Sequence, residues 1–161
     1  MVSAMARQRG FTLTEVLVVI FIIGVLAAIA FPAMNKFLVT QAVRAASYDL
    51  NADLIYARSE AIARGSTVTV QGASGTDWKQ GWTVRENGGG TMIREQSARD
   101  TQITFTANQN SVTFDRNGRA SNQMFFSIVP AAAITNPQDY RKRCIRLDPS
   151  GRPKTAEGAC A

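Results

Sequence analysis

The sequence contains no histidine and only two cysteines among its 161 residues. Without histidine there is no Ser–His or Cys–His pair to activate a nucleophile, and no imidazole to bind a metal. Two thiols are too few for a four-thiolate cluster. Charge is also scarce, since acidic and basic residues together make up 19% of the chain. These absences argue against an enzyme and against a cofactor, and favour a binding or structural protein.

One long run supplies much of the apolar content. Residues 11–34 carry a single charged side chain, that of Glu15. At about 1.5 Å per residue, a helix of this length crosses a hydrocarbon core of about 30 Å. The ten residues before it include Arg7 and Arg9 but no acid. Because basic flanks stay in the cytoplasm, we expect a single membrane pass with the rest of the chain outside the cytoplasm.

A secretory signal peptide and a plain signal anchor are the two ordinary explanations of this N-terminus. A signal peptide places its cleavage site after the apolar run, whereas the candidate processing point here, between Gly10 and Phe11, precedes the run. A signal anchor fits the hydropathy equally well. Neither explains Glu15, because a carboxylate at membrane depth is costly unless it is paired or protonated.

Residues 10–16, Gly-Phe-Thr-Leu-Thr-Glu-Val, resemble the class III signal of type IV pilins and type II secretion pseudopilins. In that family a prepilin peptidase cleaves after the glycine and methylates the new amino terminus, here Phe11. The family's acid at the fifth mature position corresponds to Glu15, and its proline at the twenty-second to Pro32. Thr14 departs from the pattern, since an aliphatic residue is commoner there.

The resemblance implies assembly roles for two of these residues. Glu15 would pair with the N-terminal amine of a neighbouring subunit, a suitable cation with an ordinary pKa of about 8, and would set the axial register of a filament. A pair within one helix is the alternative, since Phe11 lies four residues away. Pro32 lacks an amide hydrogen and clashes with the preceding turn, so we expect a kink or local melting there. An ordinary membrane kink and a weak point used by the filament both fit.

The helical pattern continues from residue 35 to Arg64, and Gly65 is a suitable stop. Residues 56–65 resemble the end of this helix in the GspH/FimT/FimU branch of the family. Because spacings of three and four residues place side chains on one face, we expect one apolar stripe to pack on a sheet. The stripe comprises Val39, Val43, Ala46, Leu50, Leu54, Ala57 and Ala61.

After Gly65 the pattern changes to short β segments separated by turns. We interpret Trp78, Trp82 and the phenylalanines as core rather than as platforms for stacking bases. The three glycines at 88–90 predict a hairpin turn, and no Gly-Lys-Ser/Thr follows to make a phosphate-binding loop. The expected segments lie at 66–71, around Trp82 and Val84, at Met92 and Ile93, at Ile103–Phe105, at Val112–Phe114, at Phe125–Val129 and at Ile145–Leu147.

A short pattern occurs twice: residues 115–119 and 148–152 both read Asp-x-x-Gly-Arg, each after an apolar residue. Aspartate can cap such a turn and glycine can adopt positive φ, so both copies predict hairpin turns. The two arginines, Arg119 and Arg152, are either simply exposed or present charge at the loop tips.

Cys144 and Cys160 both fall on the expected periplasmic side. In an oxidising compartment a disulfide is the default, and it would tie the C-terminus to the strand at Ile145–Leu147, much as pilins staple their C-terminal loop. Chain entropy assigns such a bond about 3 kcal/mol of stability.

The same region is the most basic part of the chain. Such a patch binds DNA without reading its sequence, because cations release the counterions of a polyanion. Residues 151–154, Gly-Arg-Pro-Lys, resemble the Gly-Arg-x-Arg motif of FimT-type pilins that bind DNA during transformation, with lysine in place of the last arginine. A solvated surface, or a contact with an acidic patch on another pilin, is the alternative. The candidates are Arg141, Lys142, Arg143, Arg146, Arg152 and Lys154.

Together these features predict an α+β, pilin-like fold in which a long N-terminal helix packs on a small antiparallel sheet. Its parts would be a leader of residues 1–10, a membrane or filament-core helix at 11–34, an amphipathic helix at 35–65 and a β-rich domain at 66–161.

The resemblance implies a minor pilin that co-assembles in a type IV pilus and primes or caps the filament. A DNA-binding pilin for DNA uptake and an H-type pseudopilin of a type II secretion system are the alternatives. Expected partners are major and minor pilins, the prepilin peptidase, the inner-membrane assembly platform and, for the DNA-uptake alternative, duplex DNA. The protein would reside in the inner membrane, with its C-terminal domain in the periplasm, before entering the filament.

Overall fold

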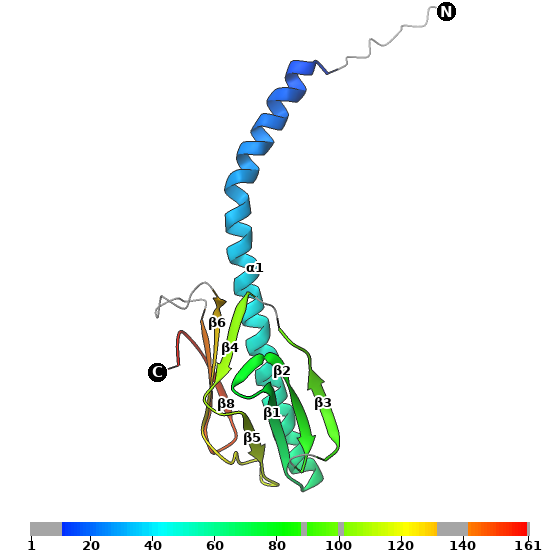
Figure 1. Cartoon of the computed structure of the whole chain (residues 1–161), viewed down its shortest axis with the longest axis vertical. Coiled ribbons are helices and arrows are strands. Elements are labelled where there is room, and N and C mark those ends of the chain that lie inside the picture. The colour runs from blue at the N-terminus through cyan, green and yellow to red at the C-terminus, as the bar shows by residue number, and fades with distance from the viewer. Residues whose placement is uncertain (1–10, 88–89, 100–101, 132–141, 161) are drawn as a thin grey trace, which may run out of the picture. The chain divides into compact units, whose positions relative to one another are not determined.

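The computed structural model describes residues 11–87, 90–99, 102–131 and 142–160, and of residues 32 and 33 only the backbone. One helix, α1 (Leu13–Arg64), precedes eight strands (Figure 1). The contacts divide the chain into two units, residues 1–37 and 38–161. The strands are β1 (Val68–Ser74), β2 (Asp77–Glu86), β3 (Met92–Gln96), β4 (Ile103–Ala107), β5 (Ser111–Phe114), β6 (Met124–Pro130), β7 (Arg143–Leu147) and β8 (Pro153–Glu157).

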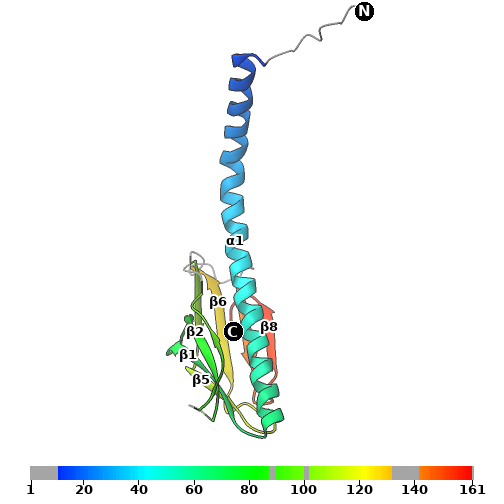
Figure 2. The same ribbon diagram turned by 90° about the vertical axis from the view of Figure 1, so that its right-hand side faces the viewer.

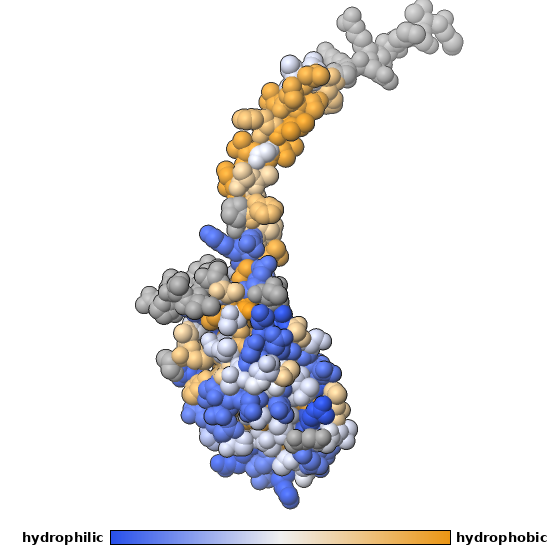
Figure 3. Space-filling view, viewed as in Figure 1, coloured by the Kyte–Doolittle hydropathy of each residue, from blue (hydrophilic) through white to orange (hydrophobic). Residues whose placement is uncertain are grey.

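The first unit consists of the N-terminal part of α1. Its described side chains are exposed, including those of Phe21, Ile29 and Phe31, and Figure 3 shows this part of the helix as apolar. The helix is long and apolar enough to serve as a membrane anchor, as the sequence predicts.

Both ends of α1 are capped by local sequence. At the start, the Thr12 hydroxyl accepts a hydrogen bond from the amide of Glu15 at 3.2 Å, which is half of a capping box. At the end, Gly65 has a φ of 60° and its amide bonds to the carbonyl of Ile62, while that of Ser66 bonds to the carbonyl of Ala61. This pair of bonds is the Schellman arrangement, so the predicted stop at Gly65 is confirmed.

In the second unit, α1 packs on one face of an antiparallel sheet (Figures 1 and 2). Six of the seven residues of the predicted stripe are at most 1% exposed, and Val39 is half-buried. Trp78, Trp82 and Phe126 fill the space between helix and sheet, which confirms the core interpretation of the tryptophans, whereas Phe125 is only half-buried and lies outside the core. Phe126 meets Trp78 edge-on at 4.8 Å between ring centroids.

The sheet consists of two ribbons that meet at one point. The strand order is β5-β1-β2-β4-β6-β7-β8, and β3 pairs with the C-terminal half of β2. Strands β2 and β4 are paired only at Asp77 and Thr106. One ribbon is therefore β5-β1-β2-β3 and the other is β4-β6-β7-β8.

Strand β8 was not expected from the sequence, which predicted a turn at residues 148–152 and gave no strand after it. Pro153 instead opens β8, where its missing amide hydrogen is tolerated because β8 ends the sheet. The next four residues are all exposed, so no alternation of apolar and polar residues marked this strand.

Candidate functional site

The predicted processing and assembly residues lie just before α1 and in its N-terminal part. Phe11 is 82% exposed, and Glu15 is exposed in the first helical turn, where its charge complements the helix dipole. Gly10 lies outside the described residues. Position 32 lies within α1, whose assignment continues through the proline. The roles of Phe11, Glu15 and Pro32 stay predictions.

The predicted disulfide is present. Cys144 of β7 is bonded to Cys160, with 5.1 Å between the two Cα atoms. Cys144 is 1% exposed, and its neighbour Ile145 belongs to the core. The bond therefore ties the end of the chain to a buried strand.

Replacing both cysteines by serine is expected to lower the free energy of unfolding by about 3 kcal/mol, because the bond restricts the unfolded chain. Urea denaturation followed by the fluorescence of the two buried tryptophans measures the change. The wild-type protein in dithiothreitol should reproduce it. An unchanged midpoint in the double variant would contradict this account of the disulfide.

The six basic residues predicted to bind DNA do not form one surface. Arg141 lies outside the described residues. Lys142 is 4% exposed and Arg143 8%, and the guanidinium of Arg143 lies 2.8 Å from a carboxylate oxygen of Glu157. These two side chains are buried in the domain, where a polyanion would not reach them.

The other three candidates are exposed, and two of them lie in one row. Arg146 of β7 pairs with Phe125 of β6 on one side and with Lys154 of β8 on the other. Paired residues of neighbouring strands share a face, and Arg146 lies 5.7 Å from the centroid of the Phe125 ring. Lys154 is 3.9 Å from Asp148. Arg152 directly precedes β8.

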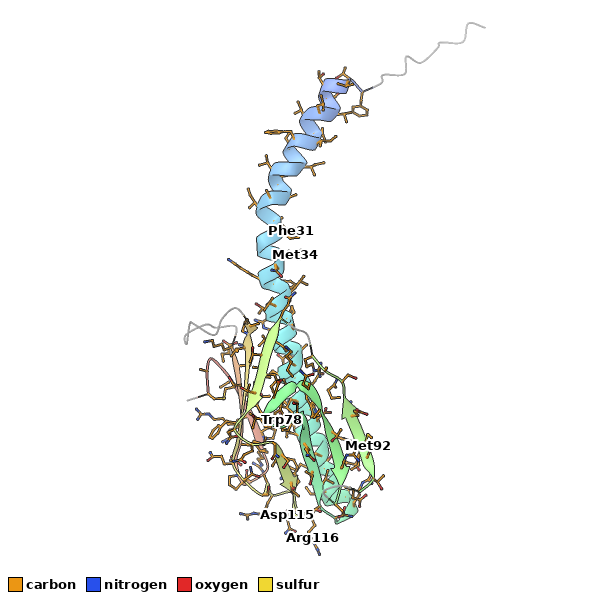
Figure 4. All side chains as sticks on the ribbon, viewed as in Figure 1. Phe31, Met34, Trp78, Met92, Asp115 and Arg116 are labelled. Carbon is orange, nitrogen blue, oxygen red and sulfur yellow. A yellow bond between two sulfur atoms is a disulfide. The ribbon has the colours of Figure 1, made fainter. Side chains whose placement is uncertain are left out.

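The two Asp-x-x-Gly-Arg segments form turns of the same design. In the first, Asp115 Oδ1 accepts hydrogen bonds of 2.8 Å from the amides of Asn117 and Arg119, and Gly118 has a φ of 73°. Figure 4 shows Asp115 and Arg116 beyond the end of β5. The sequence analysis predicted this capping and this glycine conformation, and both are confirmed.

In the second turn, Asp148 accepts hydrogen bonds from the amide and the hydroxyl of Ser150, and Gly151 has a φ of 75°. The Ser150 hydroxyl lowers the pKa of Asp148 below its ordinary value, and Lys154 contributes less. Arg119 and Arg152, the last residues of the two turns, are both exposed, as predicted.

The two turns lie side by side, which the sequence did not reveal. The amide of Ala120 donates to the carbonyl of Pro149 at 3.2 Å, and Gly151 packs on the carbonyl of Gly118. Arg58 of α1 donates from Nε to the same carbonyl at 2.9 Å. We call this arrangement the double turn. It joins the β5 end of one ribbon to the β7–β8 end of the other.

A second polar cluster, centred on Asp53, links β3 to α1. Asp53 is 2% exposed, and its carboxylate accepts a 2.8 Å hydrogen bond from Trp82 Nε1 and lies 2.9 Å from Arg94 of β3. Arg94 also covers the ring of Tyr56 at 5.6 Å. Both carboxylate oxygens have partners, as burial of a charge requires. No spacing in the sequence connected these residues.

Within the described ranges, no three His, Cys, Asp or Glu side chains are close enough to hold a metal ion. Four features of the described structure could serve a function. They are the start of α1, the face of β6, β7 and β8 that carries Phe125, Arg146 and Lys154, the double turn, and the exposed side of α1.

Two family models match the chain. The model of type II transport protein GspH matches residues 46–151, which is more than half of the sequence. The prokaryotic N-terminal methylation motif matches residues 5–31. The comparison with curated proteins found no match.

Solved structures with the same fold include minor pilins and pseudopilins. The type IV minor pilin FimU of Pseudomonas aeruginosa is 23% identical with a TM-score of 0.62, and the match covers 74% of this chain and 95% of FimU. A second crystal structure of FimU is 22% identical with a TM-score of 0.61, and the match covers 73% of this chain and 99% of FimU. The minor pseudopilin EpsH of the Vibrio cholerae type II secretion system is 10% identical with a TM-score of 0.58, over 76% of this chain and 99% of EpsH.

Proposed function

We propose that this chain, which belongs to the family of type II transport protein GspH, is a minor pilin that co-assembles in a type IV pilus and primes or caps the filament. The observation that carries the proposal is the combination of two parts in one chain. One is a capped, exposed apolar helix that carries Glu15 in its first turn and follows directly after Phe11 and Thr12, and the other is a GspH-type β domain. The first provides a means of joining a filament, and the second gives the subunit its own surface.

The residues around the start of α1 suggest how the protein would be processed and assembled. A prepilin peptidase would remove residues 1–10 and methylate Phe11. The protein would wait in the inner membrane with its domain in the periplasm until the assembly platform transfers it to the filament. There Glu15 would pair with the N-terminal amine of a neighbouring pilin, because a carboxylate among apolar helices needs a cation.

A type IV pilus and a type II secretion pseudopilus predict different effects of deleting the gene. Deletion of the gene is expected to reduce the number of surface pili, and complementation should restore it. The chain should also be found in sheared pili. A deletion strain with normal pili and blocked export of secreted enzymes would identify an H-type pseudopilin instead.

DNA binding is the second candidate, and the row across the outer face of the ribbon favours it. Phe125, Arg146 and Lys154 are paired across three strands, and Arg152 precedes the last of them. Exposed cations beside an aromatic ring suit a nucleic-acid strand, since cations contact phosphates and the ring stacks on bases. This candidate needs neither Lys142 nor Arg143.

The DNA candidate is tested with Arg152→Ala/Lys154→Ala in the detergent-solubilised full chain. Loss of two phosphate contacts should make the plot of the logarithm of the DNA-binding constant against the logarithm of the salt concentration less steep, by about 2 units of slope. It should also weaken binding to a duplex roughly tenfold. The matched control is Arg44→Ala/Lys79→Ala, which removes the same charge from α1 and β2. Equal duplex binding by both double variants, or no binding by the wild type, would rule the candidate out.

A further inference from the structure

The double turn brings together arginines from three parts of the chain. Arg116 and Arg119 belong to the first turn and Arg152 to the second, and all three are exposed. Their side chains form no ion pair with any residue that the structure describes. Arg58 of α1 is half-buried and uses one nitrogen, Nε, for the carbonyl of Gly118. The double turn therefore presents guanidinium groups that can bind an anion from outside the domain.

The two aspartates of the double turn do not neutralise these arginines. Asp115 Oδ1 accepts hydrogen bonds from the backbone amides of Asn117 and Arg119. Asp148 accepts hydrogen bonds from Ser150, and its nearest cation is the Lys154 ammonium at 3.9 Å. Both carboxylates thus serve the backbone and side chains of their own turns, and positive charge remains in excess on the outer surface.

The contact between the turns fixes the distance between Arg119 and Arg152. Gly151 packs on the carbonyl of Gly118, and each arginine directly follows one of these glycines. Because consecutive Cα atoms are about 3.8 Å apart, the Cα atoms of the two arginines lie within about 11 Å of each other. Residues two or three positions apart in an extended chain are separated by about 7–10 Å. Two acids with that spacing can therefore reach both arginines.

Every basic residue of the double turn is an arginine. The planar guanidinium donates two parallel hydrogen bonds to a carboxylate, and it is more weakly hydrated than an ammonium group. Protein interfaces are enriched in arginine and depleted in lysine, whereas unspecific attraction to a polyanion needs only positive charge. The residue type favours recognition of carboxylates in a protein.

Duplex DNA fits the double turn less well than a protein segment does. DNA carries one negative charge per about 1.7 Å of its axis, so a duplex over the arginines would also bring phosphates close to Asp115 and Asp148. A protein segment can place an acid opposite each arginine and an uncharged residue opposite each aspartate. The DNA candidate above uses Arg146 and Lys154 on the face of the sheet, and shares only Arg152 with the double turn.

We propose that the double turn is a docking site for an acidic segment of a partner protein. Two aspartate or glutamate side chains, two or three residues apart in an extended segment, pair with Arg119 and Arg152. Arg58 and Arg116 add positive charge that steers the segment toward the site. The proposal goes beyond the proposed function, because it assigns a partner chemistry to the domain whichever filament the chain enters.

The test measures binding of a fluorescent peptide of alternating glutamate and serine to the detergent-solubilised full chain, by anisotropy at low salt. Arg119→Ala/Arg152→Ala is expected to weaken binding about tenfold or more, because two charge pairs are lost. The matched control Arg44→Ala/Lys79→Ala removes the same charge from α1 and β2 and should bind as the wild type does. Arg58 is left unchanged, since its bond to Gly118 supports the first turn. Equal binding by the two double variants, or no binding by the wild type, would overturn the proposal.

Two further measurements separate carboxylate recognition from simple charge attraction. Arg119→Lys/Arg152→Lys keeps the charge but loses the guanidinium fork, so we expect it to bind the glutamate peptide at least about fivefold more weakly. Wild-type affinity in this variant would overturn the proposal. So would displacement of the peptide by duplex DNA at a lower concentration than by unlabelled peptide. No step requires a pilus, so these results and the effect of deleting the gene on piliation test the two proposals separately.

Discussion

Replacing Gly151 by alanine is expected to lower the free energy of unfolding by about 3 kcal/mol or more, the largest effect of any single exchange in the double turn. Two costs add at this position. The φ of 75° disfavours any residue with a Cβ by about 1–2 kcal/mol. The new Cβ would also lie 2.0 Å from the carbonyl oxygen of Gly118, which is backbone and cannot rotate away. One of the two turns must therefore move, and the bond between Ala120 and Pro149 should weaken.

The matched control is Gly158→Ala. Gly158 has a φ of 98°, but nothing lies within 4 Å of the position that its Cβ would take. It should therefore show only the backbone cost, about 1–2 kcal/mol. Urea denaturation followed by tryptophan fluorescence measures both variants. If the two variants are equally destabilised, the contact between the turns does not contribute to stability.

Replacing Glu15 by alanine is expected to leave cleavage and N-methylation intact and to abolish co-assembly. The carboxylate is the single charge in residues 11–34, so no other side chain there can pair with a neighbour's amine. The measurement is the amount of the chain in sheared filaments relative to the amount in membranes. Normal recovery of the variant in sheared filaments would refute the prediction.

Glu15→Gln separates assembly from helix capping. Glu15 is the third residue of a helix capped by Thr12, and glutamine serves this capping box as glutamate does. If the charge is what matters, Glu15→Gln should fail to assemble just as Glu15→Ala does. Recovery of assembly in Glu15→Gln alone would mean that α1 needs a capped start rather than a charge.

The sequence by itself determined the features that depend on neighbouring residues. The helix follows from its apolar spacing and its two caps, and Gly65 ends it where the pattern predicted. The two Asp-x-x-Gly-Arg turns also form locally, because aspartate and glycine satisfy each turn within five residues. The stripe that packs on the sheet was readable for the same reason. Each of these predictions depends on the spacing of residues a few positions apart in the sequence.

The cysteine pair is an intermediate case. With two cysteines in a chain expected to be exported, only one intramolecular bond could form, so counting residues was enough to predict it. Geometry was not needed. The burial of Lys142 and Arg143 beside it, however, could not be read from composition. Two charges that looked like part of a basic surface have their side chains inside the domain.

Only the tertiary structure decided how distant segments meet. Strand β8 has no apolar pattern and exists because β7 offers it a row of backbone partners. Asp53 is paired with Trp82 and Arg94, 29 and 41 positions away, since the packing of helix on sheet brings them together. The two turns could be recognised as a repeated sequence pattern. Their contact forms only because both ribbons of the sheet pack on the same helix. Such contacts depend on the whole chain path, which no local pattern encodes.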